Sequence, residues 1–287
     1  MRPPATPAAS AVVERCQGIC GELALRRVQL PPGAGGVSGH GSSAGGAGAE
    51  QYEIISDGMF LMATYNRQSE EALGREAVAC WRELREAPAQ ELREVPVASP
   101  ATTPPCSSEP TARDWGPRVL VGGLGVGYTV AAVLAEAPDA RCDVVELEPV
   151  VVDWHSRYLA AYSGNPLDDP RVRLLVGDVG RHLRRVASER PGSYDIVLLD
   201  TDNGPGWLAS AANAALYSGG GLRAVHAALD TPGVAAYWSA SASPAFARRL
   251  RSCFGHTRSR RVPSEAALTP DVIYFGLKLH GDVPEGE

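Results

Sequence analysis

The segment Arg118-Val-Leu-Val-Gly-Gly-Leu-Gly-Val-Gly-Tyr128 constrains the fold of this chain more than any other. Its apolar, β-branched run Val119 to Val121 predicts a strand, and the segment from Thr129 to Glu136 predicts a helix. A strand, a glycine turn and a helix present backbone N–H groups and a positive helix end to a nucleotide-like ligand. A glycine turn without any ligand has the same pattern, so other residues have to decide between the two interpretations.

Strand and helix patterns continue to alternate after this turn. Continuous apolar runs such as Ile196 to Leu199 are typical of central parallel strands that are covered on both faces. We expect strands at 119–121, 141–147, 172–176, 194–199, 234–239, 257–262 and 272–277, and helices at 129–136, 150–162, 179–189, 220–229 and 244–253. This alternation predicts a Rossmann-like, doubly wound α/β sheet.

The first part of the chain has a different pattern. Alternating segments at 21–30, 51–56 and 59–65 predict strands, with a turn at Asp57-Gly58, and a helix that Ser69 caps follows them. We therefore expect four regions: a disordered N-terminus (1–20), a small β-domain with one helix (21–87) that carries a flexible glycine-rich loop (31–49), a proline-rich linker (88–117), and a nucleoside-binding domain (118–280).

Composition excludes several classes of function. The formal net charge of -6 and the pI near 5.6 do not suit a nucleic-acid-binding protein, and no apolar run is long enough to span a membrane. The six cysteines do not form paired Cys-x-x-Cys motifs, and no histidine joins them at zinc spacing, so we expect no metal site. We expect a cytoplasmic protein, with organelle import as the alternative because no acidic residue precedes Glu14.

Acidic residues follow the predicted strands, at the sheet edge where ligands of such folds bind. Glu146 lies about 20 residues after the glycines, the spacing of an acid that accepts both ribose hydroxyls. A solvated acid is the alternative, and Glu148 takes the role if the register differs. Asp178 suits either an adenine amine or the N-cap of the next helix. Asp200 and Asp202 could accept a proton from an amine, or they could have only a structural role in stabilising the turn.

These strand-end motifs resemble those of class I S-adenosylmethionine-dependent transferases and, more narrowly, of the spermidine/spermine synthase family. The resemblance covers roughly Gln51 to Leu279 and is carried by Asp57-Gly58, Glu70-Glu71, Val-Leu-Val-Gly-Gly123, Val-Glu-Leu-Glu148, Val-Gly-Asp178, Tyr-Asp-Ile-Val-Leu-Leu-Asp200 and Leu216-Tyr217. It implies a small N-terminal β-domain and a homodimer. It also implies that Gly122 and Gly123 approach the nucleoside, that Glu146 holds the ribose, that Asp178 reads the adenine, and that Asp200 helps to deprotonate an attacking amine.

Four departures from the family pattern concern the amine half of the site. The family motif Gly-Gly-Gly-Asp-Gly reads Gly122-Gly-Leu-Gly-Val126 here, and Phe60-Leu-Met62 replaces a glutamine. Leu73 lies near an expected tyrosine, and the segment after the catalytic aspartate is shortened to Asp200-Thr-Asp-Asn-Gly-Pro205. The residues predicted to bind the nucleoside match the family pattern, whereas this chain has fewer of the family's polyamine-binding residues.

Three hypotheses follow. The first is transfer of an aminopropyl group from decarboxylated S-adenosylmethionine to an amine. The second is methyl transfer from S-adenosylmethionine to another small-molecule acceptor, and the third is a non-catalytic member of the family. The predicted cofactor-binding residues are Gly122, Gly123, Gly125, Gly127, Glu146, Asp178 and Asp200, and the predicted catalytic residues are Asp200 and Asp202.

Overall fold

The computed structural model describes residues 10–29, 50–86, 116–201, 203–205, 211–264 and 269–280. The expected flexible loop and nearly all of the expected proline-rich linker lie outside these residues, and so does Asp202.

A four-stranded antiparallel sheet comes first in the chain, with the order β1-β2-β3-β4. Its strands are β1 (Ser10–Gln17), β2 (Glu22–Gln29), β3 (Glu50–Ser56) and β4 (Met59–Ala63). Asp57 and Gly58 join β3 to β4 with φ angles of 47 and 78 degrees. A two-residue hairpin needs this left-handed backbone, which Asp and Gly tolerate, so the predicted turn is confirmed.

Strand β1 corrects one prediction, because residues 10–17 were assigned to a disordered N-terminus. This strand pairs with β2 from Ser10 to Gln17, with an irregularity between Val12 and Glu14. It is an edge strand and largely exposed, so it lacks the clear alternation that marks a half-buried strand. Partners far along the chain help to hold it: the Glu14 carboxylate accepts hydrogen bonds from Trp154 Nε1 at 2.8 Å and from the Tyr158 hydroxyl at 2.7 Å.

The second sheet has seven strands in the order β10-β11-β9-β8-β5-β6-β7. They are β5 (Arg118–Gly122), β6 (Arg141–Glu146), β7 (Val172–Val176), β8 (Tyr194–Leu199), β9 (Leu229–Ser239), β10 (His256–Val262) and β11 (Asp271–Lys278). The strands from β7 to β9 run parallel, and β11 and β10 are antiparallel additions at one edge. The predicted doubly wound sheet is therefore confirmed, with an antiparallel edge that periodicity did not reveal.

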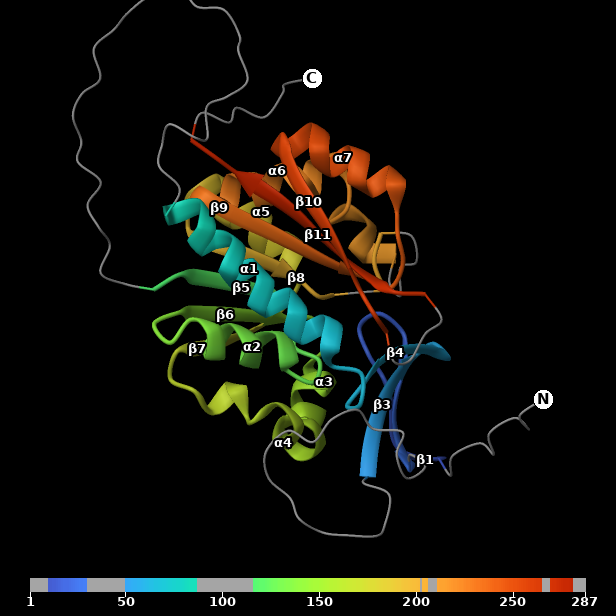
Figure 1. Cartoon of the computed structure of the whole chain (residues 1–287). Coiled ribbons are helices and arrows are strands. Elements are labelled where there is room, and N and C mark those ends of the chain that lie inside the picture. The colour runs from blue at the N-terminus through green and yellow to red at the C-terminus, as the bar shows by residue number, and fades with distance from the viewer. Residues whose placement is uncertain are drawn as a thin grey trace, which may run out of the picture.

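Helices cover both faces of the large sheet (Figure 1). They are α1 (Gln68–Glu86), α2 (Tyr128–Glu136), α3 (Pro149–Trp154), α4 (Ala160–Ser163), α5 (Val179–Glu189), α6 (Gly219–Ala228) and α7 (Pro244–Phe254), with a π-helical segment η2 (His155–Leu159) between α3 and α4 and 3-10 turns η3 (Pro166–Asp168) and η4 (Ala211–Ala215). One core lies between the sheet and α1 with α2, and a second lies between the opposite face and α5, α6 and α7.

Helix α1 belongs to the packing of the large sheet. It contacts α2 and the strands β8, β9 and β11, although it follows β4 directly in the chain. Ser69 does not cap it as predicted, because the helix begins at Gln68 and the Ser69 hydroxyl donates a hydrogen bond to Asp271 instead. The first turn of α1 is thereby joined to the start of β11.

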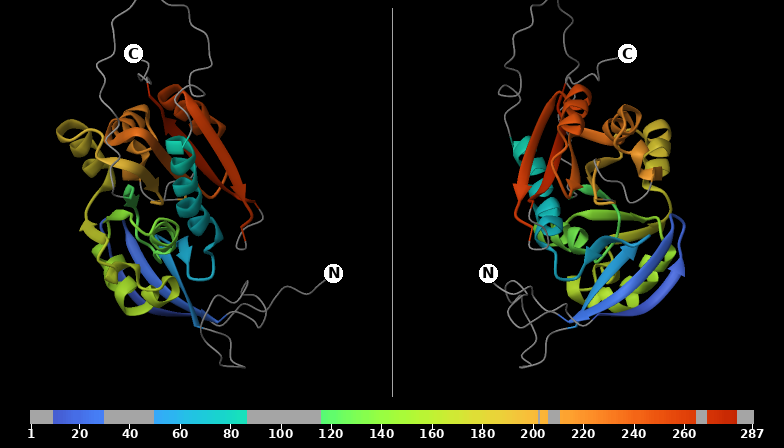
Figure 2. Two further views of the ribbon diagram at one scale, coloured as in Figure 1. Left: turned by 60° about the vertical axis from the view of Figure 1, so that its left-hand side comes forward. Right: turned by 90° about the vertical axis from the view of Figure 1, so that its right-hand side faces the viewer.

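The small sheet packs against the large domain through an apolar cluster. Leu25 and Ile54 of the small sheet meet Tyr128 of α2, Trp154 of α3 and Leu159 of η2 in this cluster. The two views of Figure 2 agree that the four strands lie at one end of the large domain, beside the α3–α4 segment. This is the end toward which the parallel strands point, so the small sheet helps to enclose their carboxyl ends.

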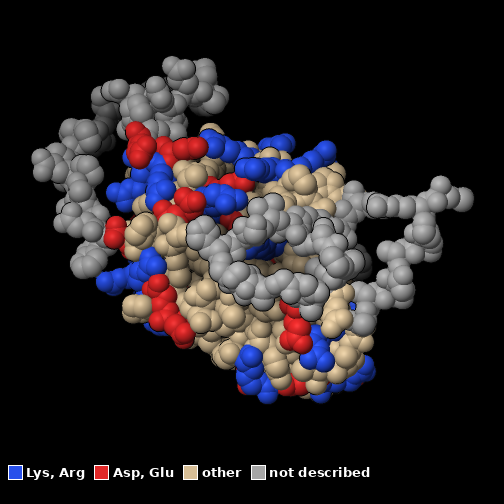
Figure 3. Space-filling model, turned by 60° about the horizontal axis from the view of Figure 1, so that its bottom comes forward, with Lys and Arg blue, Asp and Glu red and all other residues tan. Residues whose placement is uncertain are grey.

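On the face shown in Figure 3, Lys and Arg side chains lie in groups together with Asp and Glu side chains, and a broad area between these groups shows neither. This face carries no extended patch of one sign. In the described part of the chain, no helix combines the length and hydrophobicity that crossing a membrane requires.

Candidate functional site

A cavity of about 280 Å³ lies at the carboxyl ends of the parallel strands. Its volume is close to that of small-molecule pockets, which begin at about 300 Å³. The strand ends supply one wall, and the β1–β2 turn, β4 and the start of α1 supply others. The predicted residues that line the cavity are Gly123, Gly125, Glu146, Asp178 and Asp200.

The glycine turn after β5 is shaped by close packing. Gly123 has a φ angle of 93 degrees, and a Cβ there would lie 2.2 Å from the backbone oxygen of Asp200. Gly125 also has a positive φ, and its carbonyl oxygen lies 3.2 Å from Nδ1 of the buried His155, which donates to it. Other residues would therefore move this turn out of place.

Gly122 and Gly127 are positioned differently from the other two predicted glycines. Neither lines the cavity. A Cβ on Gly122 would press on Leu199 of β8, and one on Gly127 would press on Pro166 and His155 behind the turn. These two glycines are explained by packing between elements, while their assignment to a cofactor stays a prediction.

Glu146 ends β6 and is almost completely buried. One carboxylate oxygen accepts a hydrogen bond from Leu124 N and the other from Glu148 N, both at 2.8 Å. Burial raises the pKa of Glu146, and these backbone hydrogen bonds oppose the rise. The carboxylate thus fixes the glycine turn, and each oxygen keeps a second lone pair for a ligand in the cavity.

Glu148 lines the cavity as well, but its carboxylate is engaged by the small sheet. The N–H groups of Ile19 and Cys20 donate to its two oxygens at 2.8 Å each. A Cβ on Gly18 would lie 2.7 Å from this carboxylate, so the β1–β2 turn approaches it closely. Glu148 therefore joins the two sheets, and Glu146 stays the acid predicted to face a nucleoside.

Asp178 follows β7 and caps α5. One of its oxygens, Oδ1, accepts hydrogen bonds from Gly180 N at 2.7 Å and Arg181 N at 3.1 Å. The N-cap alternative is thereby confirmed. The residue also lines the cavity, so the second carboxylate oxygen leaves the adenine role open as a prediction.

Asp200 follows β8 and borders the cavity. The Thr129 hydroxyl of α2 donates to its Oδ2 at 2.7 Å. Burial raises the pKa of Asp200 to about 6, the hydrogen bond from Thr129 opposes the rise, and the charge of Asp271 adds to it. A carboxylate with a pKa near the working pH suits a general base.

Two further acids share this part of the cavity, and neither is among the predicted site residues. Glu70, in the first turn of α1, and Asp271, the first residue of β11, both line the cavity. Burial, followed by the charges of Asp200 and Asp271, raises the pKa of Glu70 well above its usual value. The Glu70-Glu71 motif was noticed without a role, whereas no local signal marked Asp271.

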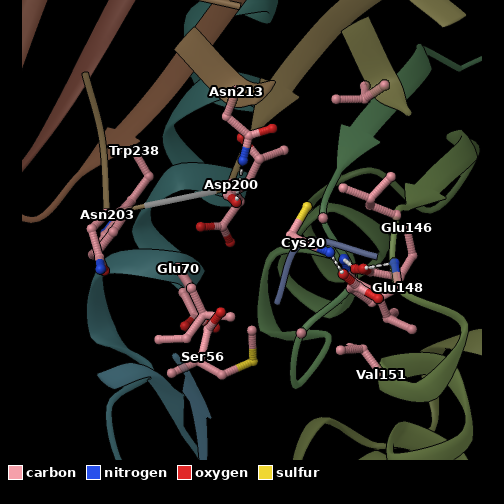
Figure 4. A pocket seen from close by; sticks show the side chains of 18 of the residues that line it. Cys20, Ser56, Glu70, Glu146, Glu148, Val151, Asp200, Asn203, Asn213 and Trp238 are labelled. Carbon is pink, nitrogen blue, oxygen red and sulfur yellow. Dashed lines mark hydrogen bonds between the residues drawn. The ribbon is translucent and has the colours of Figure 1, made fainter. Parts of the chain in front are cut away.

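The cavity therefore has two sides (Figure 4). Glu146 and Glu148 lie with Cys20 on one side, and Glu70 and Asp200 lie on the opposite side. Within the described part of the chain, no Lys or Arg side chain lines the cavity. One side thus offers an acid at the ribose position of such folds, and the other offers a negatively charged environment for a cation.

Comparison with known proteins agrees with this geometry. A family model for the spermine/spermidine synthase domain matches residues 112–247. Putrescine N-methyltransferase 1 of Nicotiana tabacum is 30% identical over 86 residues, which are 30% of this chain and 22% of that protein. Polyamine aminopropyltransferase of Clostridium perfringens (strain SM101 / Type A) is 37% identical over 90 residues, which are 31% of this chain and 30% of that protein. The matches span less than a third of these relatives' length.

Solved structures of spermidine synthases have a similar fold. One in complex with the transition state analogue AdoDATO has a TM-score of 0.63 at 15% identity, over 93% of this chain and 73% of that chain. The enzyme from Thermotoga maritima has a TM-score of 0.61 at 15% identity, over 93% and 72%. The glycine turn and the acids Glu146, Asp178 and Asp200 all lie within the segment that matches the spermine/spermidine synthase domain model.

Proposed function

We propose that this protein transfers an aminopropyl group from decarboxylated S-adenosylmethionine to an amine. The observation that carries the proposal is the acidic side of the cavity, where Glu70, Asp200 and Asp271 face a space without a described Lys or Arg. Decarboxylated S-adenosylmethionine and an amine at neutral pH both bring positive charge. These positively charged ligands stabilise the ionised form of acids that would otherwise repel one another.

The proposed chemistry uses the two sides of the cavity together. Gly123 and Glu146 hold the nucleoside, so that the sulfonium lies toward Asp200. Asp200 accepts a proton from the acceptor ammonium, and the free amine nitrogen attacks the methylene carbon next to the sulfonium. The new N–C bond forms as the C–S bond breaks, and methylthioadenosine leaves with the electron pair on sulfur. Orientation of the two reactants and proton transfer supply the acceleration.

Methyl transfer from intact S-adenosylmethionine is the second candidate, and one observation favours it. The family motif has an aspartate where this chain has Gly125, and the Met62 sulfur lies 3.0 Å from the position of a Cβ on that glycine. A thioether in place of a carboxylate removes a repulsion against the donor's own carboxylate. Sequence similarity to putrescine N-methyltransferases supports the same candidate.

The reaction product separates the two candidates. Purified protein is incubated with either donor and a set of primary amines, and the released nucleoside is identified by mass spectrometry. Aminopropyl transfer predicts methylthioadenosine with the decarboxylated donor, and methyl transfer predicts S-adenosylhomocysteine with the intact donor. Formation of neither nucleoside above the level of an Asp200→Asn variant would overturn both.

A further inference from the structure

A buried histidine lies behind the glycine turn that follows β5. His155, the first residue of η2, is 1% exposed and is not among the described residues that line the cavity. Its Nδ1 lies 3.2 Å from the carbonyl oxygen of Gly125, a residue that does line the cavity. A carbonyl oxygen can only accept, so Nδ1 carries a proton and donates the hydrogen bond. His155 therefore holds part of the cavity wall without reaching the cavity itself.

The second ring nitrogen shows that packing alone does not account for His155. Nε2 is buried and has no hydrogen-bond partner among the described residues. With the proton on Nδ1, the neutral ring leaves Nε2 unprotonated, and burial lowers the pKa of His155, which favours this neutral form. A leucine would fill the same space without an unpaired buried nitrogen. The hydrogen bond to Gly125 is what histidine adds at this position.

The same segment holds a second carbonyl group of the turn. The Ser163 hydroxyl, at the end of α4, donates to the carbonyl oxygen of Val126 at 2.6 Å. A Cβ on Gly127 would lie 3.0 Å from both His155 Cε1 and Ser163 Oγ, so the turn lies directly against this segment. Since a peptide unit is planar, fixing these two carbonyl groups also fixes the N–H groups on the same units. Two successive peptide units of the turn are thus oriented from behind.

The segment that carries this histidine is also fixed to the small sheet. Trp154 Nε1 donates to Glu14 of β1 at 2.8 Å, and the Tyr162 hydroxyl donates to the carbonyl oxygen of Glu50 in β3 at 2.6 Å. The π-helical turn η2 lies between these two contacts. Such turns are rare and are frequently found at functional sites. The segment therefore gives the histidine a fixed position from which to orient the glycine turn.

We propose that His155 is a positioning residue for the donor: its hydrogen bond to Gly125 sets the orientation of the glycine turn against which the nucleoside lies. This inference rests on the nucleoside binding that the proposed function requires. A turn that is oriented before the ligand arrives raises affinity, because less ordering is needed on binding. Loss of the hydrogen bond should therefore weaken nucleoside binding, although the histidine does not touch the nucleoside.

Three substitutions at His155 separate the hydrogen bond from the packing. Asn carries its amide nitrogen on Cγ, where histidine carries Nδ1, whereas Gln carries it one bond farther out and Leu has no donor. We expect the Kd for methylthioadenosine, measured by calorimetry, to rise about tenfold in His155→Gln and His155→Leu and to stay within about threefold of wild type in His155→Asn. S-adenosylhomocysteine is measured in parallel, because methyl transfer would release that nucleoside instead.

A second histidine supplies the matched control. His256 is exposed at the start of β10, so His256→Gln should leave the nucleoside Kd unchanged. Wild-type Kd in a folded His155→Gln protein would refute the positioning role and leave the proposed function intact. An equal rise in Kd in all three His155 variants, with an equal loss of thermal stability, would show that the ring acts by packing alone, which also refutes the role of the hydrogen bond.

Ser163→Ala tests the orientation of the turn even where a His155 variant fails to fold. It removes only a hydroxyl, and the nucleoside Kd should rise about threefold. An unchanged Kd would contradict the proposal that the contacts behind the turn control affinity. Nucleoside binding by a wild type that transfers no group to any amine would overturn the proposed function alone. A wild type that binds neither nucleoside would overturn both.

Discussion

At the scale of single residues, the surroundings of the acids in this cavity disfavour their ionised form. Asp200 is partly removed from water beside another acid, and its pKa is raised to about 6. A group whose pKa is higher in the folded than in the unfolded state stabilises the fold at low pH. That stabilisation is lost as the pH rises through the folded-state pKa. Asp200 therefore costs stability at neutral pH, which is where a base must be ionised to act.

Replacing Asp200 with Asn should separate these two effects. We expect transfer to fall at least about 100-fold, because the proton acceptor is lost. The free energy of unfolding of the variant relative to wild type should increase by on the order of 2 kcal/mol between pH 4 and pH 8, as the wild type loses stability. Urea unfolding at both pH values measures this. Asp153→Asn, at an exposed position of α3, should show no such change, and an equal difference for Asp200→Asn at both pH values would contradict the raised pKa.

At the scale of elements, the strand-end acids are first of all parts of their own strand–turn–helix units. Glu146 binds backbone N–H groups at Leu124 and Glu148, and Asp178 binds those of Gly180 and Arg181. Both acids are thus oriented by backbone before any ligand arrives. Such prior orientation lowers the cost of forming a binding site. It also means that stability and ligand binding have to be measured separately for each acid.

Two substitutions distinguish the roles of Asp178. Asp178→Ala should lower the free energy of unfolding by about 1 kcal/mol, because α5 loses its N-cap. Asp178→Ser keeps a capping oxygen but offers no second oxygen to adenine. If Asp178 reads adenine, Ser should restore stability in urea unfolding while the affinity for methylthioadenosine stays low in calorimetry. Recovery of both quantities by Ser would show that the residue is only a cap.

At the scale of the whole molecule, the two sheets are joined at the cavity. Glu148 of the large domain binds the β1–β2 turn, and Cys20 and Leu23 next to this turn line the cavity. The apolar cluster around Trp154 and the contacts of Glu14 hold the rest of the small sheet. The side of the cavity that we propose to hold the nucleoside therefore depends on how the small sheet is docked.

Glu148→Gln should loosen this docking. Gln has one carboxamide oxygen, so one of the N–H groups of Ile19 and Cys20 would lose its partner and face an amide NH₂ group instead. We expect faster hydrogen exchange in residues 18–25 and weaker binding of methylthioadenosine. Glu22→Gln is the matched control, because Glu22 lies in the same sheet with an exposed carboxylate. Unchanged exchange in Glu148→Gln would show that the apolar cluster alone docks the sheet.

The local parts of this fold could be predicted because they depend on neighbouring residues. The alternation of apolar runs and amphipathic segments encodes which faces are buried, and Gly123 encodes a backbone that other residues avoid. The rule that ligands bind at the carboxyl ends of parallel strands then pointed to Glu146, Asp178 and Asp200. All three line one cavity. The two-residue turn at Asp57-Gly58 was found for the same local reason.

Strand order, strand direction and contacts between distant segments were decided only by the tertiary structure. The antiparallel direction of β11 brings Asp271 to Ser69, a residue 202 positions earlier, and no local pattern records that pairing. The pairing of β1 with β2 made a strand of a segment that is too exposed to show its period. The docking of the small sheet gave Glu148 its partners and left Glu146 to face the cavity. Sequence alone predicted where in the fold the site lies, and long-range packing decided which acids line the cavity, because a carboxylate's environment depends on every element that surrounds it.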